Sequence, residues 1–415
     1  MDHPLLVGVD IHQTTNYVCL LEAQGVAVGP RFRVANDRPG SQACAARLAQ
    51  ALQAGGFDGL RLAAEATNWY WLPFFEALAA APALQPWPCE FFALNPRLTA
   101  QYKETFSDLD KDDDTDSFVV ADRLRLGRDL PPPFRPLGPY LALRFLTRYR
   151  YHLVGQLVRS KSYYRSLLFL KLSALGPGQP FSDLFGASSQ AVLTRFADAD
   201  ALAACPLSEL VELLQHSSHG NLRQPEATAQ ALHEVAQHSY PLNPAWRESV
   251  NQVLTQVAGE IAACQRLIQA LDGLITTAML PLANPLLSIP GIGPVFSAGI
   301  IAELMGPERF ANDEAKVAQF AGLHWRKRQS GAYQAEETPL TKRGNRYLRY
   351  YLCEAANSLR LHEPSYAAYY QRKYREVRKH PHERAVVLTA RKLVRLVVRL
   401  LTTNQAYRPP RSPMP

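Results

Sequence analysis

The chain has 415 residues, 47% of them hydrophobic, which suits two or three domains with real cores. No run of about 18 apolar residues occurs and no basic segment precedes the short apolar start, so we expect no transmembrane helix and no signal peptide. The six cysteines form no CxxC pair, which indicates neither a zinc knuckle nor a disulfide framework and favours a reducing cytoplasm. The net charge of +8 is divided unevenly, with acid gathered at 104–122 and base after 325.

The first part of the chain, 1–130, predicts an α/β domain. Apolar or alternating segments that end in turn residues predict strands over 5–12, 16–25, 26–34, 60–67 and 89–96. Helical spacing predicts helices over 41–55, 71–81 and 116–128. A proline-rich segment at 129–140 then marks a domain boundary.

Beyond that boundary the predicted strands vanish, and the sequence predicts an all-α remainder. Two long helices, 141–172 and 246–279, enclose an insert of shorter helices at 173–245. This middle domain, 140–282, fits an antiparallel coiled-coil arm and a plain helical bundle equally well.

The last domain, 283–405, opens with a segment that has the pattern of a helix–hairpin–helix, 286–304. A polar, glycine-containing stretch at 326–345 and two basic amphipathic helices follow, and we expect a disordered tail at 406–415.

Acidic residues stand where carboxylates can be gathered. Asp10 and Glu65 each close a predicted strand, and Asp113 and Asp116 share a face where a helix begins, because they are spaced i,i+3. Four such carboxylates can hold two Mg²⁺ ions that clamp a phosphodiester, and Mg²⁺ prefers oxygen ligands. The competing interpretation is a solvated acidic loop, which explains Asp10 poorly, because an acid inside an apolar strand start needs a reason. His12 fits a simple turn residue better than a ligand.

The basic domain carries two further features. Gly291 and Gly293 in IPGIGP permit a tight turn whose amides can face a phosphate, although a structural corner has the same pattern. Ser330 lies in WRKRQSG among arginines that can stabilise a phosphoryl transition state, although most such serines only bind phosphate. The residues that we assign to nucleic-acid binding are Gly291, Gly293, Arg326, Lys327, Arg328, Lys342, Arg343, Asn345, Arg346 and Arg349.

Several of these motifs, in this order, resemble the DEDD transposases of bacterial insertion sequences, which are bridge-RNA-guided recombinases. VGVDIHQTTNYVCLL, AAEATNWYW, NPRLTAQYK and KDDDTDSFVVADRLRLG resemble the family's first domain. SIPGIGPVFSAGIIAEL, FAGLHWRKRQSG and TKRGNRYLRYYLCEAA resemble its transposase domain. The resemblance covers roughly 1–170 and 283–360; it departs at Asp112, where the family has threonine, and at Ser117, where it has alanine.

The resemblance implies an RNase H-like (RuvC-like) first domain, a coiled-coil middle and a serine-bearing last domain. It implies that Asp10, Glu65, Asp113 and Asp116 bind Mg²⁺, as two ions that Mn²⁺ can replace, and that Ser330 attacks DNA to form a phosphoserine link. The expected partners are donor and target DNA, a noncoding bridge RNA and further copies of the chain, as a dimer and as a tetramer on DNA. The expected location is the bacterial cytoplasm, at the nucleoid, with no membrane partner.

Two other functions fit parts of the sequence. A RuvC-like junction endonuclease would use the same acids and Mg²⁺ but hydrolyse DNA with water, without a covalent intermediate. A nucleic-acid-binding scaffold with a degenerate nuclease domain would need only the basic C-terminus. The four ordered acids count against the scaffold, and the QSG motif counts against the simple nuclease.

Overall fold

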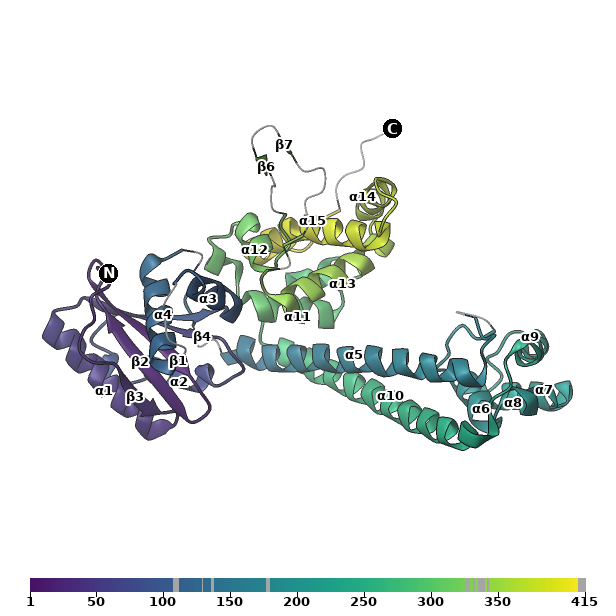
Figure 1. Cartoon of the computed structure of the whole chain (residues 1–415). Helices are drawn as coiled ribbons and strands as arrows, with labels where there is room; N and C mark the ends of the chain where they lie inside the picture. Colours follow the sequence, from purple (N-terminus) through teal and green to yellow (C-terminus); the bar gives the residue numbers. More distant parts are fainter. Residues whose placement is uncertain are drawn as a thin grey trace, which may run out of the picture. The chain divides into compact units, whose positions relative to one another are not determined.

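The computed structural model describes residues 1–106, 112–128, 130–135, 138–176, 180–325, 329–330, 333–334, 340–341 and 343–409; for 329–330 and 333–334 it describes the backbone only. Two compact units can be distinguished, one formed by Met1–Ala142 with Leu282–Pro415 and the other by Leu143–Pro281 (Figure 1). A mixed α/β N-terminal part and a mostly helical remainder confirm the coarse fold prediction.

A five-stranded sheet organises the N-terminal part. Its strands are β1 (Pro4–Ile11), β2 (Thr15–Leu21), β3 (Phe32–Ala35), β4 (Gly59–Glu65) and β5 (Cys89–Leu94), in the order β3-β2-β1-β4-β5. The pairs β1–β2 and β2–β3 are antiparallel, whereas the pairs β1–β4 and β4–β5 are parallel. The prediction of a strand over 26–34 is largely wrong, because regular pairing with β2 begins only at Phe32.

Helices cover both faces of this sheet, and the alternation of side chains along β1 decides which face each residue joins. Leu5, Val7 and Val9 pack in one core with α1 (Arg38–Gly55) and α2 (Trp71–Ala79). Leu6 packs on the other face with Val120, Ala121 and Leu124 of α4 (Asp113–Leu126). The short helices η1 (Pro82–Leu84) and α3 (Pro96–Lys103) flank β5 in the chain.

Gly8 brings α4 unusually close to β1. A Cβ atom on Gly8 would lie 2.2 Å from the backbone nitrogen of Ala121 and 2.2 Å from the backbone oxygen of Ser117. Only a residue without a side chain therefore allows this approach. The contact sets the distance between the end of β1 and the first turn of α4, which carry three of the predicted acids.

The unit Leu143–Pro281 is built on two long helices, α5 (Gly138–Lys171) and α10 (Pro244–Met279). Their hydrogen bonds from Arg150 to Asp272, at 2.5 and 3.2 Å, and a shared core that includes Leu168 and Leu254 show that they run side by side. The insert folds into α6 (Ala187–Arg195), α7 (Ala199–Ala203), α8 (Leu207–Ser217) and α9 (Pro225–His238), whose apolar faces join the same core. Whether the long helices act as a coiled-coil arm stays a prediction.

The C-terminal part comprises η2 (Pro285–Ser288), α11 (Pro294–Leu304), η3 (Pro307–Phe310), α12 (Glu314–Phe320), β6 (Gln329–Ser330), β7 (Tyr333–Gln334), α13 (Arg346–His362), α14 (Pro364–Arg375) and α15 (Pro381–Thr403). Three helices follow the polar stretch where two were expected. The reason is Pro364, which cannot continue a helix, and Glu363, whose carboxylate caps the next one through the backbone N–H of Ser365. Among the described residues, no helix has the length and apolar character needed to span a membrane.

Candidate metal centre

Two neighbouring parallel strands bring the first two acids together. Val9 of β1 is paired with Ala64 of β4, so Asp10 and Glu65 follow at the same edge of the sheet. Asp10 exposes 18% of its side chain, and Glu65 is half-buried. This register places the two predicted carboxylates on neighbouring strands.

The other two acids lie in the first turn of α4. Asp112 begins this helix as its N-cap and accepts a hydrogen bond of 2.6 Å from the backbone N–H of Thr115. Asp113 and Asp116 follow, at the end of the helix where the unpaired N–H groups favour negative charge. Because Gly8 holds α4 against β1, these acids face the edge of the sheet that carries Asp10.

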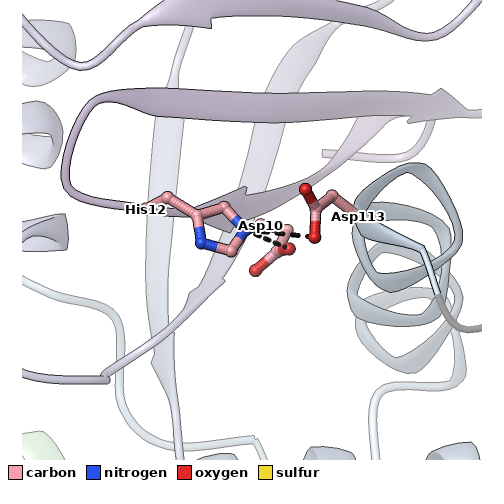
Figure 2. A group of neighbouring side chains, drawn as sticks. All are labelled: Asp10, His12 and Asp113. Carbon is pink, nitrogen blue, oxygen red and sulfur yellow. Dashed lines mark hydrogen bonds and ion pairs between the residues drawn. The ribbon is translucent and has the colours of Figure 1, made fainter.

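His12 joins this group, as Figure 2 shows. Its Nε2 atom lies 3.0 Å from Oδ2 of Asp10 and 3.4 Å from Oδ1 of Asp113. Asp10, His12 and Asp113 each offer one ligand atom, and these atoms all lie within 4.8 Å of one another, close enough to hold a metal ion. The turn after β1 fixes the backbone of His12, whose N–H donates to the Thr15 carbonyl and whose carbonyl accepts from Asn36 Nδ2.

The electrostatics of the centre connect all four predicted acids. Burial first, and then the negative charges of Asp10 and Asp116, together raise the pKa of Glu65 to about 7. Burial also raises the pKa of Asp10, while the neighbouring His12 opposes this and Asp116 and Asp113 add to it. Half-buried carboxylates that destabilise one another in this way are suited to a bound cation.

The predicted DNA-binding hairpin precedes α11 as expected. Gly291 adopts a φ of +80°, and a Cβ atom there would lie 2.6 Å from Nδ1 of His362, so this glycine is packed against α13. Its carbonyl accepts a hydrogen bond of 2.6 Å from the Ser358 hydroxyl. Gly293 is the N-cap of α11, and a Cβ atom there would meet nothing within 4 Å. Of the two, Gly293 is therefore the one with space beside it for a ligand.

Ser330 lies in a two-stranded antiparallel pair. Gln329 is paired with Gln334 and Ser330 with Tyr333. Its side chain lies outside the described residues. The predicted nucleic-acid-binding residues Arg326, Lys327, Arg328 and Lys342 also lie outside them.

Three of the described basic-domain residues, Asn345, Arg346 and Arg349, lie at the N-terminal end of α13. Asn345 caps α13 through the backbone N–H groups of Tyr347 and Leu348, and its Nδ2 donates to Oε2 of Glu303 at 2.6 Å. Arg349 donates to the Ala321 carbonyl at 3.0 Å. Arg346 is exposed, and its guanidinium lies over the Tyr347 ring.

Arg343 contributes to the same region through its backbone, because its carbonyl lies 2.7 Å from where a Cβ atom of Gly322 would stand. That glycine has a φ of +70° and leaves room for the crossing chain. The roles of these residues in nucleic-acid binding stay predictions.

Comparison with known proteins covers both ends of the chain. A transposase family profile of the DEDD, IS110 type matches residues 7–170, and the profile "Transposase IS116/IS110/IS902 family" matches residues 283–371. The chain belongs to the IS110/IS116 family of insertion-element transposases. The first match contains all four predicted acids and His12, and the second contains Ser330.

Two curated relatives belong to insertion elements. The chain is 26% identical over 301 residues to "Insertion element IS116 uncharacterized 44.8 kDa protein" of Streptomyces clavuligerus. The matched region covers 72% of this chain and 73% of the relative. It is 27% identical over 302 residues to "Insertion element IS900 uncharacterized 42 kDa protein" of Mycobacterium paratuberculosis, with the same shares. Membership of this transposase family implies that the protein cleaves and recombines DNA and that it uses a divalent metal ion.

Sequence reasoning missed two residues of the transposase. His12 was assigned to a turn, which is where it lies, but its ring points to the acids; its spacing of two from Asp10 is the signal that could have found it. Glu303 is fully buried in the otherwise apolar helix α11, and such an acid inside an apolar run needs a partner. That signal was visible in GIIAEL.

Proposed function

We propose that this transposase is a site-specific recombinase that cuts and rejoins DNA strands with Mg²⁺ and a serine nucleophile. The observation that carries the proposal is the cluster of Asp10, His12 and Asp113, whose ligand atoms all lie within 4.8 Å of one another, with the charges of Glu65 and Asp116 acting on the same site. Family membership supplies the substrate, which is DNA.

We infer an RNase H-like (RuvC-like) fold for the N-terminal part. Three antiparallel strands continued by two parallel ones, with acids at the ends of β1 and β4 and at the start of α4, support this inference. In such an arrangement, acids that are distant in the sequence meet because the strand ends and one helix start share an edge.

The donor set fits the metal that the family implies. Most of the donor atoms are carboxylate oxygens, and Mg²⁺ and Mn²⁺ prefer such oxygens to sulfur ligands. Asp10, Asp113 and His12 would hold one ion, and Glu65 and Asp116 would complete a second position beside them. When bound, two such ions stabilise the attacking and leaving oxygens of a phosphodiester.

In the proposed reaction, the Ser330 hydroxyl attacks a phosphodiester. A bond forms between Ser330 Oγ and phosphorus, the bond from phosphorus to a deoxyribose oxygen breaks, the serine gives up its proton and the leaving oxygen takes one. Attack by the hydroxyl of a second strand on the phosphoserine then rejoins DNA and frees the serine. The surrounding arginines, Arg326 and Arg328 among them, would stabilise the negative charge that develops on the phosphate.

We also propose that a noncoding bridge RNA selects the sites and that a dimer, and a tetramer on DNA, carries out the exchange. The basic C-terminal part supports RNA binding, and exchange between two duplexes requires several strands to be cut together. Binding of the RNA that flanks the gene, compared with an unrelated RNA of equal length, tests the guide: equal affinities would contradict it.

A cleavage assay tests the metal centre. Wild type, Asp10→Ala and Glu65→Ala are compared on element-end DNA with Mg²⁺ and with EDTA, and Glu90→Ala, which removes a carboxylate from the Arg61–Glu90 surface pair, serves as the control. We expect cleavage only with Mg²⁺ and only in wild type and the control. Cleavage by Asp10→Ala would refute the centre.

A further inference from the structure

Lys103 places a positive charge inside the acidic centre. Its ammonium group donates a hydrogen bond to Oδ1 of Asp116. The side chains of Lys103 and Asp116 are 27% and 38% exposed, so water screens this pair only in part. The ammonium also acts on Glu65, whose charged form it favours. Lys103 therefore offsets part of the negative charge that the four acids bring together.

The fold holds Lys103 in this position. It is the last residue of α3, whose N-cap Asn95 accepts a hydrogen bond from the backbone N–H of Arg97. The preceding residue, Tyr102, donates its hydroxyl to Oδ2 of Asp122 at 2.5 Å. Two successive residues of α3 thus bind two acids of α4. The contact between Tyr102 and Asp122 holds this end of α3 beside α4, and Lys103 is thereby kept close to Asp116.

A second pair of contacts secures that arrangement. Arg125 donates to the other oxygen of Asp122 at 2.6 Å, and the guanidinium of Arg123 lies 5.7 Å from the centre of the Tyr102 ring. Asp122 is buried, so a satisfied network around it keeps α3 against α4. This network places the ammonium group without using any of the predicted metal ligands.

An ammonium group and a divalent cation compete for the same carboxylate. Both are attracted by the lone pairs of Asp116, and at hydrogen-bonding distance they repel each other strongly in a partly shielded site. We propose that Lys103 is a placeholder cation, which neutralises Asp116 while the centre is metal-free and is displaced from it when a divalent ion binds. This inference rests on the proposed metal centre and adds a residue that sets how readily the centre is loaded.

Titration with Mn²⁺ tests the placeholder without any cleavage. Free Mn²⁺ is measured by its electron paramagnetic resonance signal, with the full chain and no nucleic acid. We expect Lys103→Met to bind Mn²⁺ about tenfold more tightly than wild type, which corresponds to about 1.4 kcal/mol. Lys103→Arg keeps the positive charge, so we expect it to bind Mn²⁺ no more tightly than wild type. Arg61→Met removes a cation from a surface pair with Glu90 and is expected to change nothing.

Unchanged or weaker Mn²⁺ binding by Lys103→Met would overturn the inference, and weaker binding would show that Lys103 orients Asp116 as a ligand instead. Thermal unfolding is the second measurement. Metal-free Lys103→Met should have a lower melting temperature than wild type, because the acids lose their counter-ion. Added Mn²⁺ should raise its melting temperature by more than it raises that of wild type. An equal gain in both proteins would also overturn the inference. If wild type and Asp10→Ala bind Mn²⁺ equally, the proposed metal centre itself fails, and the inference falls with it.

Discussion

Gly8 is the residue at which a single methyl group should disrupt the metal centre. In Gly8→Ala the new Cβ atom would stand 2.2 Å from the backbone nitrogen of Ala121 and 2.2 Å from the backbone oxygen of Ser117. Ordinary contacts begin at 3.4 Å, so α4 and β1 must separate by about 1.2 Å, the difference between these distances. Both opposing atoms belong to the backbone, so no side-chain rotation relieves the clash.

The expected cost of Gly8→Ala is about 1–3 kcal/mol of stability, as for other overpacked cores. The separation also moves Asp113 away from Asp10, and a displacement of about 1 Å in a catalytic site can cost about 10²-fold in rate. Calorimetry should therefore show a lower melting temperature, and Mn²⁺ binding should weaken. The matched control is Gly259→Ala in α10, where a Cβ atom meets nothing within 4 Å and alanine should stabilise the helix by up to about 1 kcal/mol. Wild-type stability and Mn²⁺ affinity in Gly8→Ala would refute the close approach of α4 to β1.

Three further predictions concern single side chains. His12→Ala should weaken Mn²⁺ binding about tenfold or more, because an imidazole that contacts both Asp10 and Asp113 is lost; unchanged binding in the titration would show that His12 is no ligand. Glu303→Ala should destabilise the protein by about 1–3 kcal/mol in calorimetry and increase hydrogen exchange at 320–325 and 343–345, because the side-chain amide of Asn345 loses a buried partner; unaltered exchange would contradict this. Burial lowers the pKa of Lys171 to about 8, so the folded state releases a proton that the unfolded state keeps up to about pH 10. The unfolding free energy of wild type should therefore rise relative to that of Lys171→Met between pH 8 and pH 10, and a flat difference across that range would refute the shift.

The sequence was sufficient to predict where the acids would gather. Asp10 and Glu65 end apolar strands, and the parallel pairing of β1 with β4 then brings those ends to one edge. The choice of Asp113 and Asp116 from a crowded acidic run depended on the family resemblance, because spacing alone does not select among neighbouring aspartates. The structure adds the reason for the N-terminal turn of α4, which is the cap formed by Asp112.

The contacts that complete the centre could not be predicted, because they depend on tertiary packing. Lys103 meets Asp116 only when α3 is held against α4, and nothing in their spacing indicates this pairing. The approach that Gly8 permits is equally invisible, since a glycine inside a strand is also compatible with a bulge. The same holds for Asn345, which was assigned to nucleic acid by its position in a basic motif and which caps α13 and contacts Glu303.

The most direct test of the recombinase proposal is a search for a covalent protein–DNA adduct. Wild type, Ser330→Ala and Asp10→Ala are incubated with element-end DNA, Mg²⁺ and the flanking RNA, and the products are separated on denaturing gels. We predict an adduct in wild type that both substitutions abolish, because the serine and the acids act as one active site. Cleavage that continues in Ser330→Ala, with no adduct in any sample, would contradict it and identify water as the nucleophile of a junction endonuclease.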